Sequence, residues 1–254
     1  MNYRVESKIR ARQLIKGKAF GVFLTMLGVE LILLIPTILI SIAMFVVGII
    51  DINSLESSTM SKVFEAVDTI VSFVMVLISI PVQVGLVAKF ISVARGGEAR
   101  DVSAFFLFKE KKTSEVYKAN FLVALYVLLG TICLIIPGII ISLRYAFLSH
   151  VFCDNPNLTY REAMEKSRQL TKGRKGQIFF YHFSFLGWYL LVLVTFGIAS
   201  IYVIPYENVA FASYYSLCAS ENGDTINRYA TYGNNDPYEY DNDPYKYDND
   251  PYEN

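Results

Sequence analysis

Four long apolar blocks occupy most of the chain and constrain its fold more than any other feature. They cover residues 19–50, 66–94, 121–152 and 178–218. A helix needs about 20 apolar residues to cross the roughly 30 Å of hydrocarbon in a bilayer. Only 18% of the residues are charged, whereas about a quarter are charged in a typical soluble domain. The blocks therefore predict an all-α, polytopic membrane helix bundle.

The positions of the basic residues predict how often the chain crosses the membrane. Lysines and arginines gather in residues 4–18, 95–118 and 161–175, and short basic segments stay on the cytoplasmic side. The block at 121–152 must then cross twice, with Pro137 and Gly138 in the turn, and the acidic segment 51–68 lies outside. We expect six transmembrane helices as three hairpins, with both termini cytoplasmic.

A basic motif occurs twice and predicts an internal repeat. ARQLIKGK at residues 11–18 returns as SRQLTKGR at 167–174, where Thr159 and Glu162 match a capping box and Gly173 a helix stop. With the basic segment 103–120, the pattern predicts three tandem units, each a basic amphipathic interfacial helix followed by a hairpin. Such helices place lysines and arginines at lipid phosphates. The basic residues expected to face anionic headgroups are Arg12, Lys16, Lys18, Arg168, Lys172, Arg174 and Lys175.

Three ionisable residues inside the predicted spans are candidates for function, because charge is costly in hydrocarbon. They are Glu30, Arg144 and Glu207. A pair between Arg144 and either Glu207 or Glu30 would offset the desolvation of both groups. We expect a structural ion pair, and the alternative is a transport pathway. Lys89, near the end of its span, is expected to extend to the headgroups.

Composition and motifs give no support for enzymatic chemistry, a cofactor or nucleic-acid binding. The chain contains no P-loop, nucleophile elbow or HExxH signature, and the glycines of ARGGEAR at 94–100 predict a turn. Cys133, Cys153 and Cys218 have no metal-ligand spacing and are expected to be small buried hydrophobes. His150, His182 and Asp154 lie at a similar predicted depth, where interfacial polarity explains them better than a metal site does.

The chain divides at residue 220 into a membrane domain, residues 1–220, and a tail, residues 221–254. The tail carries nine acidic and two basic residues and three copies of NDPY at a seven-residue period. Proline in every repeat and the scarcity of aliphatic residues are typical of disorder. We expect a solvated cytoplasmic tail.

The third and fourth blocks resemble a known family. The Pro-Gly step at 137, Asp-Asn-Pro at 154–156, EAMEKSRQLTKGRK at 162–175, FSFLGW at 183–188 and PYENVAFASYYS at 205–216 are similar to the bacterial integral membrane family known as domain of unknown function 975. The resemblance covers roughly residues 8–220. It implies a multi-pass protein of the bacterial plasma membrane and supplies no catalytic residue and no substrate.

These observations favour a non-enzymatic scaffold or accessory protein. Its expected partners are the lipid bilayer, through anionic headgroups, and a further membrane protein. The alternative is a transporter or channel with a pathway near Glu30 and Arg144.

Overall fold

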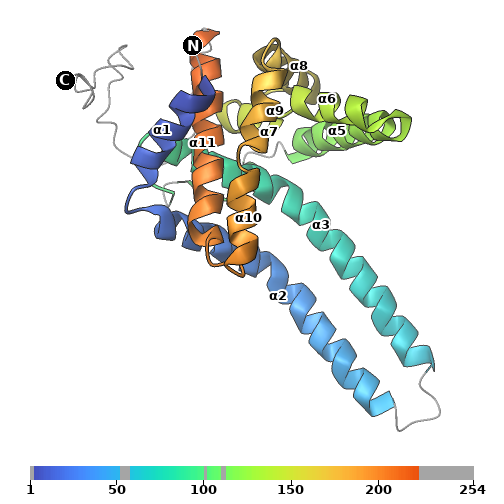
Figure 1. Ribbon diagram of the computed structural model, residues 1–254. Coiled ribbons are helices and arrows are strands. Elements are labelled where there is room, and N and C mark those ends of the chain that lie inside the picture. The colour runs from blue at the N-terminus through green and yellow to red at the C-terminus, as the bar shows by residue number, and fades with distance from the viewer. Residues whose placement is uncertain (1–2, 52–57, 100–101, 110–112, 223–254) are drawn as a thin grey trace.

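The computed structural model describes residues 3–51, 58–99, 102–109 and 113–222, and all regular structure within these ranges is helical (Figure 1). The predicted all-α fold is therefore confirmed. The helices are α1 Tyr3–Ile15, α2 Ala19–Asp51, α3 Ser58–Ala94, α4 Phe106–Lys109, α5 Thr113–Cys133, α6 Ile135–Arg144, α7 Leu148–Asp154, α8 Tyr160–Thr171, α9 Lys175–Phe183, α10 Leu186–Val194 and α11 Ser200–Glu221.

Five stretches of helix in the described residues are long and apolar enough to cross a membrane. They are Ala19–Ala43, Glu65–Ala94, Thr113–Cys133, Ile135–Asp154 and Lys175–Val194. The longest two belong to α2 and α3, and the second half of α2 and the first half of α3 extend away from the other helices as one long arm (Figure 1). Large apolar side chains are exposed along this arm, among them Leu39 and Phe73. Water would not favour such a surface, but hydrocarbon would.

The third apolar block reverses direction at Leu134, which separates α5 from α6. The two helices then run back along each other so closely that a Cβ on Gly138 would lie 2.2 Å from Thr131 Oγ1. The expectation that Pro137 and Gly138 form the tip of this turn is wrong by three to four residues. Pro137 lies instead in the first turn of α6, where an amide has no intrahelical acceptor and proline is tolerated.

The fourth block contains α9, α10 and α11, and α11 is the exception among the long helices. Its 22 residues include Glu207, Asn208 and several tyrosines and serines, and it is not among the five candidate spans. The helix instead packs against α1, α2 and α3, which bury most of its second half. Because neighbouring helices cover α11, its surface does not have to match hydrocarbon.

The two copies of the basic motif have the same local structure. Each helix ends at an equivalent residue, Ile15 in α1 and Thr171 in α8, and both residues are fully buried. In each copy, the backbone then turns at a glycine with positive φ, which is 78° at Gly17 and 76° at Gly173. This backbone conformation favours glycine. The next helix begins two residues later in both copies. The repeat in the sequence is thus a repeat in structure.

The middle segment departs from the predicted repeat. Its described helix before α5 is α4, which has four residues, against 13 in α1 and 12 in α8. Residues 100–101 and 110–112 of this segment lie outside the described residues. Helices of similar length therefore occupy the first and third copies, whereas the described part of the second copy has only α4. The interfacial position of these helices stays a prediction.

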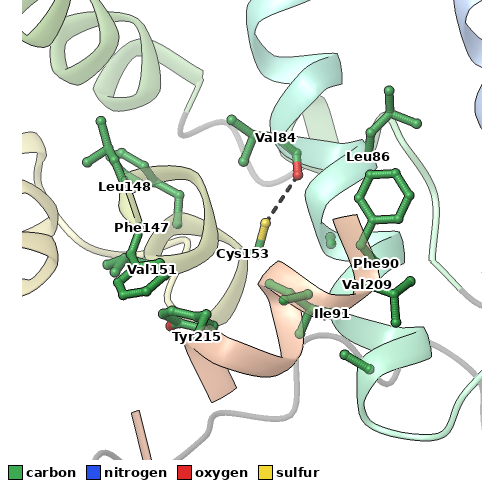
Figure 2. Packing of buried hydrophobic residues seen from close by; sticks show 14 of the residues in the cluster. Val84, Leu86, Phe90, Ile91, Phe147, Leu148, Val151, Cys153, Val209 and Tyr215 are labelled. Atoms are coloured by element: carbon green, nitrogen blue, oxygen red, sulfur yellow. Dashed lines mark hydrogen bonds between the residues drawn. The ribbon is translucent and has the colours of Figure 1, made fainter. Parts of the chain in front are cut away.

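The buried core lies where the second half of α3, α7 and α11 converge (Figure 2). Figure 2 shows side chains from these helices packed around Cys153, whose Sγ donates to the Val84 carbonyl oxygen at 3.1 Å. Cys153 and Cys218 are buried, as expected, whereas Cys133 is exposed at the end of α5. This convergence brings together the ends of three helices that are far apart in the sequence.

Candidate functional site: a buried polar junction

Arg95, Asp154 and Tyr215 form a polar junction between α3, α7 and α11. Arg95 is the residue that directly follows α3. The helix ends in a Schellman motif, in which Gly97 N–H donates to the Ser92 carbonyl at 2.9 Å and Gly96 N–H to the Val93 carbonyl at 3.0 Å. Gly96 supplies the required positive φ of 91°. The glycines of this segment therefore form a helix-ending turn, as the sequence predicted. The turn holds the Arg95 side chain at the end of α3.

Asp154 receives Arg95 and a second donor. The guanidinium donates through Nη1 and Nη2 to the two carboxylate oxygens, each at 2.8 Å. Tyr215 on α11 donates its hydroxyl to Asp154 Oδ2 at 2.9 Å. The side chain of Asp154 is only 3% exposed and that of Arg95 13%. One carboxylate at the end of α7 thus joins the end of α3 to the second half of α11.

The hydrogen-bond geometry of the trio Arg95, Asp154 and Tyr215 determines its chemical role. Two charges removed from water are stable together only with close, well-aligned hydrogen bonds, and the paired, planar contact between arginine and carboxylate supplies them. Three donors already occupy the Asp154 carboxylate, which makes it a structural acceptor. The trio therefore fixes the relative positions of three helices.

His150 lies beside the trio in an aromatic setting. Its ring centroid is 5.1 Å from that of Tyr215 and 5.3 Å from that of Phe211. Its Nδ1 is buried and has no hydrogen-bond partner. In the described part of the chain, no three histidine, cysteine, aspartate or glutamate side chains are grouped so as to hold a metal ion.

A second polar cluster surrounds Glu207 on α11. The Tyr189 hydroxyl on α10 donates to the Glu207 carboxylate, and Tyr181 on α9 donates to the Glu207 carbonyl at 2.8 Å. His182 Nδ1 lies 3.5 Å from Oε1. Lys8 reaches this region from α1, with Nζ 4.5 Å from the centroid of the Phe185 ring. Burial lowers the pKa of Lys8, and the Glu207 carboxylate opposes that shift.

The predicted ion pairs of Arg144 are absent from the described residues. Glu30 accepts a hydrogen bond from Gln83 Nε2 at 2.9 Å, which links α2 to α3. The Arg144 guanidinium lies 5.9 Å from the Tyr145 ring centroid, and the Arg144 carbonyl accepts from the Thr171 hydroxyl at 2.9 Å. Arg144, Glu30 and Glu207 therefore belong to three separate contacts.

The residues expected to face lipid fall into two groups. Arg12, Lys16, Lys18, Arg168 and Lys172 are exposed, and Arg168 lies 3.3 Å from the Glu165 carboxylate. Lys175 is half-buried, and so is Arg174, which pairs with Glu221 and lies over the Tyr3 ring at 5.4 Å. Tyr3 also forms a hydrogen bond with Glu221, and this bond raises the pKa of the Tyr3 hydroxyl. Lys89 is buried and donates to the Ala99 carbonyl at 2.9 Å, so it does not extend to the headgroups.

The sequence contains one signal that could have identified the junction. Pro81 and Pro137 each follow an isoleucine, and Arg95 and Asp154 lie 14 and 17 residues after them, which places opposite charges at similar distances beyond two matching Ile-Pro steps. No comparable signal marks Tyr215 among the eighteen tyrosines of the chain.

These features define an all-helical protein whose apolar helices are of the kind that cross membranes. The family described as protein of unknown function, DUF975, matches residues 62–222, and the chain belongs to this family. The match begins in α3 and ends just after α11, so it starts later than the expected residue 8. Neither the curated proteins nor the solved structures give a match to the chain.

Proposed function

We propose that this chain is a multi-pass protein of the bacterial plasma membrane that acts as a scaffold or accessory protein through lipid and protein contacts. In this proposal, six helical passes form three hairpins, and both termini are cytoplasmic. The observation that carries it is the combination of the buried junction of α3, α7 and α11 with the exposed apolar arm of α2 and α3.

Contacts between helix ends support two of the three out-and-back passages. Arg95 after α3 touches Asp154 at the end of α7, so the chain between them leaves and returns. Arg174, just before α9, pairs with Glu221 at the end of α11, so this stretch also leaves and returns. Because both stretches return, α11 serves as the sixth pass despite its low hydropathy, and it is covered by protein for much of its length.

Charge supports the proposed orientation. The ends that meet at the junction carry the basic segments, whereas Glu65 and Asp68 lie toward the far end of the arm. Basic segments are retained on the cytoplasmic side. The proposed orientation therefore has the junction and both termini inside the cell.

The contacts of three carboxylates, of which Asp154 is buried, support a structural role. Glu30, Asp154 and Glu207 each accept a hydrogen bond from a side chain on another helix. Arg144, the cation of the alternative transport pathway, interacts with Tyr145 and Thr171 instead. A continuous line of ionisable groups would favour transport, and separate interhelical contacts favour fixed packing.

Ion flux into proteoliposomes distinguishes the scaffold from the transporter. We expect Glu30→Gln to leave proton and cation flux unchanged, as should the matched control Glu65→Gln at the far part of the arm. Crosslinking in native membranes should recover the same protein neighbours with Glu30→Gln as with the original chain. A change in flux with Glu30→Gln but not with Glu65→Gln would establish the transport pathway and contradict the scaffold.

A further inference from the structure

The two structural copies of the basic motif differ on their outer surfaces. In α1, Val5 and Ile9 are exposed, at 47% and 56%. The equivalent residues of α8, 156 positions later, are Arg161 and Glu165, which are also exposed. After the turn, exposed Phe20 in α2 corresponds to exposed Gly176 in α9. These three exposed apolar residues of the first copy are thus charged or small in the second, whereas farther along exposed Leu24 corresponds to exposed Phe180.

The inward faces of the two helices are alike, so packing inside the protein does not explain this difference. Ser7, Ala11 and Ile15 of α1 are fully buried, and so are the equivalent Ala163, Ser167 and Thr171 of α8. The two outward faces therefore reflect what lies outside the protein at each copy. Charged residues are suited to water, whereas exposed valine and isoleucine are suited to an apolar surrounding.

The outer face of α1 also carries positive charge. Val5, Ile9, Arg12 and Lys16 follow each other at helical spacing and are all exposed, which makes one stripe with an apolar and a basic part. This stripe leads into α2, where Phe20 and Leu24 are exposed within a candidate span. An apolar and basic stripe continuous with a membrane span matches the boundary between acyl chains and anionic headgroups.

We infer that the outer face formed by Val5, Ile9 and Arg12 of α1 and by Lys16 just after it binds the bilayer surface through anionic phospholipid, whereas the equivalent face of α8 faces water. This inference rests on the proposed membrane location and adds a difference between the two copies. The two faces have separate roles although their inner packing is shared. A second copy of this chain on the α1 face is the competing occupant.

Fluorescence quenching by lipid tests the inference. In a Cys133→Ser background, where the remaining cysteines Cys153 and Cys218 are buried, an environment-sensitive fluorophore is attached to Ile9→Cys or to its matched control Glu165→Cys. The protein is reconstituted in phosphatidylcholine vesicles with or without phosphatidylglycerol, and lipids with a nitroxide near the headgroup serve as quencher. We expect severalfold stronger quenching at position 9 than at 165, increased by phosphatidylglycerol.

Two further measurements make each outcome decisive. A label at Leu39→Cys on the arm should be quenched by a nitroxide deep in the acyl chains. Quenching at 39 with equal or no quenching at 9 and 165 would overturn this inference alone, and absence of quenching at 39 would overturn the membrane location as well. Disulfide crosslinking between Ile9→Cys copies without lipid quenching would assign the face to a second copy and reject the lipid.

Discussion

Asp154 is the residue on which the junction depends, because it accepts from Arg95 and from Tyr215 while almost fully buried. Removing one member of a buried pair leaves the other charge without compensation. The contribution of the trio to the free energy of unfolding therefore cannot be divided among its single residues. A test must compare single with combined substitutions.

We expect Asp154→Ala to lower the free energy of unfolding by about 3–5 kcal/mol, since it leaves the Arg95 guanidinium buried and unpaired. The combined replacement Arg95→Met, Asp154→Leu and Tyr215→Phe removes every partner together and should cost much less. Denaturant unfolding in detergent micelles measures both.

The exposed pair of Glu165 and Arg168 supplies the matched control. Both side chains are about half exposed, and such pairs contribute about 0–1 kcal/mol. Glu165→Ala should therefore change the free energy of unfolding little. If Asp154→Ala cost no more than Glu165→Ala, the junction would not hold the helices as described.

At the scale of helices, the contact between α3 and the segment before α5 depends on Gly85. A Cβ at this position would lie 1.9 Å from the Ala104 carbonyl oxygen and 2.5 Å from its carbon. These are backbone atoms, which cannot move aside as a flexible side chain can. The absence of a side chain at Gly85 is what lets the α4 segment approach α3.

We expect Gly85→Ala to destabilise the protein by about 1–3 kcal/mol, because the backbone at Ala104 must be displaced. Gly28→Ala in α2 is the control, since no atom lies within 4 Å of its added Cβ, and alanine is favoured over glycine in a helix by about 1 kcal/mol. The apparent melting temperature in detergent should fall for the first variant and stay level or rise for the second. Equal effects would mean that Gly85 and Ala104 are not in close contact.

Some helix limits are predictable from the sequence because they depend on nearby residues. The helix α2 begins at Ala19 and α3 ends at Ala94, as the apolar blocks indicate. The capping box of Thr159 and Glu162 forms at the start of α8. The sequence pattern misplaces the turn between α5 and α6 because proline has two local uses, as a breaker and as a residue of a first helical turn, and spacing alone does not distinguish them.

At the scale of the whole molecule, orientation in the membrane is the property that the proposed function most needs. In a Cys133→Ser background, we expect Asn53→Cys to react with a membrane-impermeant maleimide on intact cells. Gly97→Cys and Lys172→Cys should react only after the cells are permeabilised, because basic segments stay inside. Reaction at Gly97 in intact cells without reaction at Asn53 would invert the proposed orientation.

The acidic, solvated tail that the sequence predicts lies mostly outside the described residues, which end at Asn222. Its first residue, Glu221, is the last residue of α11 and pairs with Arg174. The boundary at residue 220 stays a prediction.

The apolar runs, the repeated motif and the caps follow from local chemistry. The sequence by itself therefore determines the helical class, some helix ends and the shared turns at Gly17 and Gly173. It does not determine the partners of the charged residues. Depth and charge alone match Arg144 to Glu207 or Glu30, yet Glu207 meets Tyr189, Glu30 meets Gln83 and Asp154 meets Arg95. Depth along a helix is a one-dimensional property that sequence spacing reports. Packing between segments far apart in the chain determines which way each helix face points and which neighbour it meets. Lys8 and Tyr206, which are in contact although 198 residues apart, are an example. Only the tertiary structure decides such contacts.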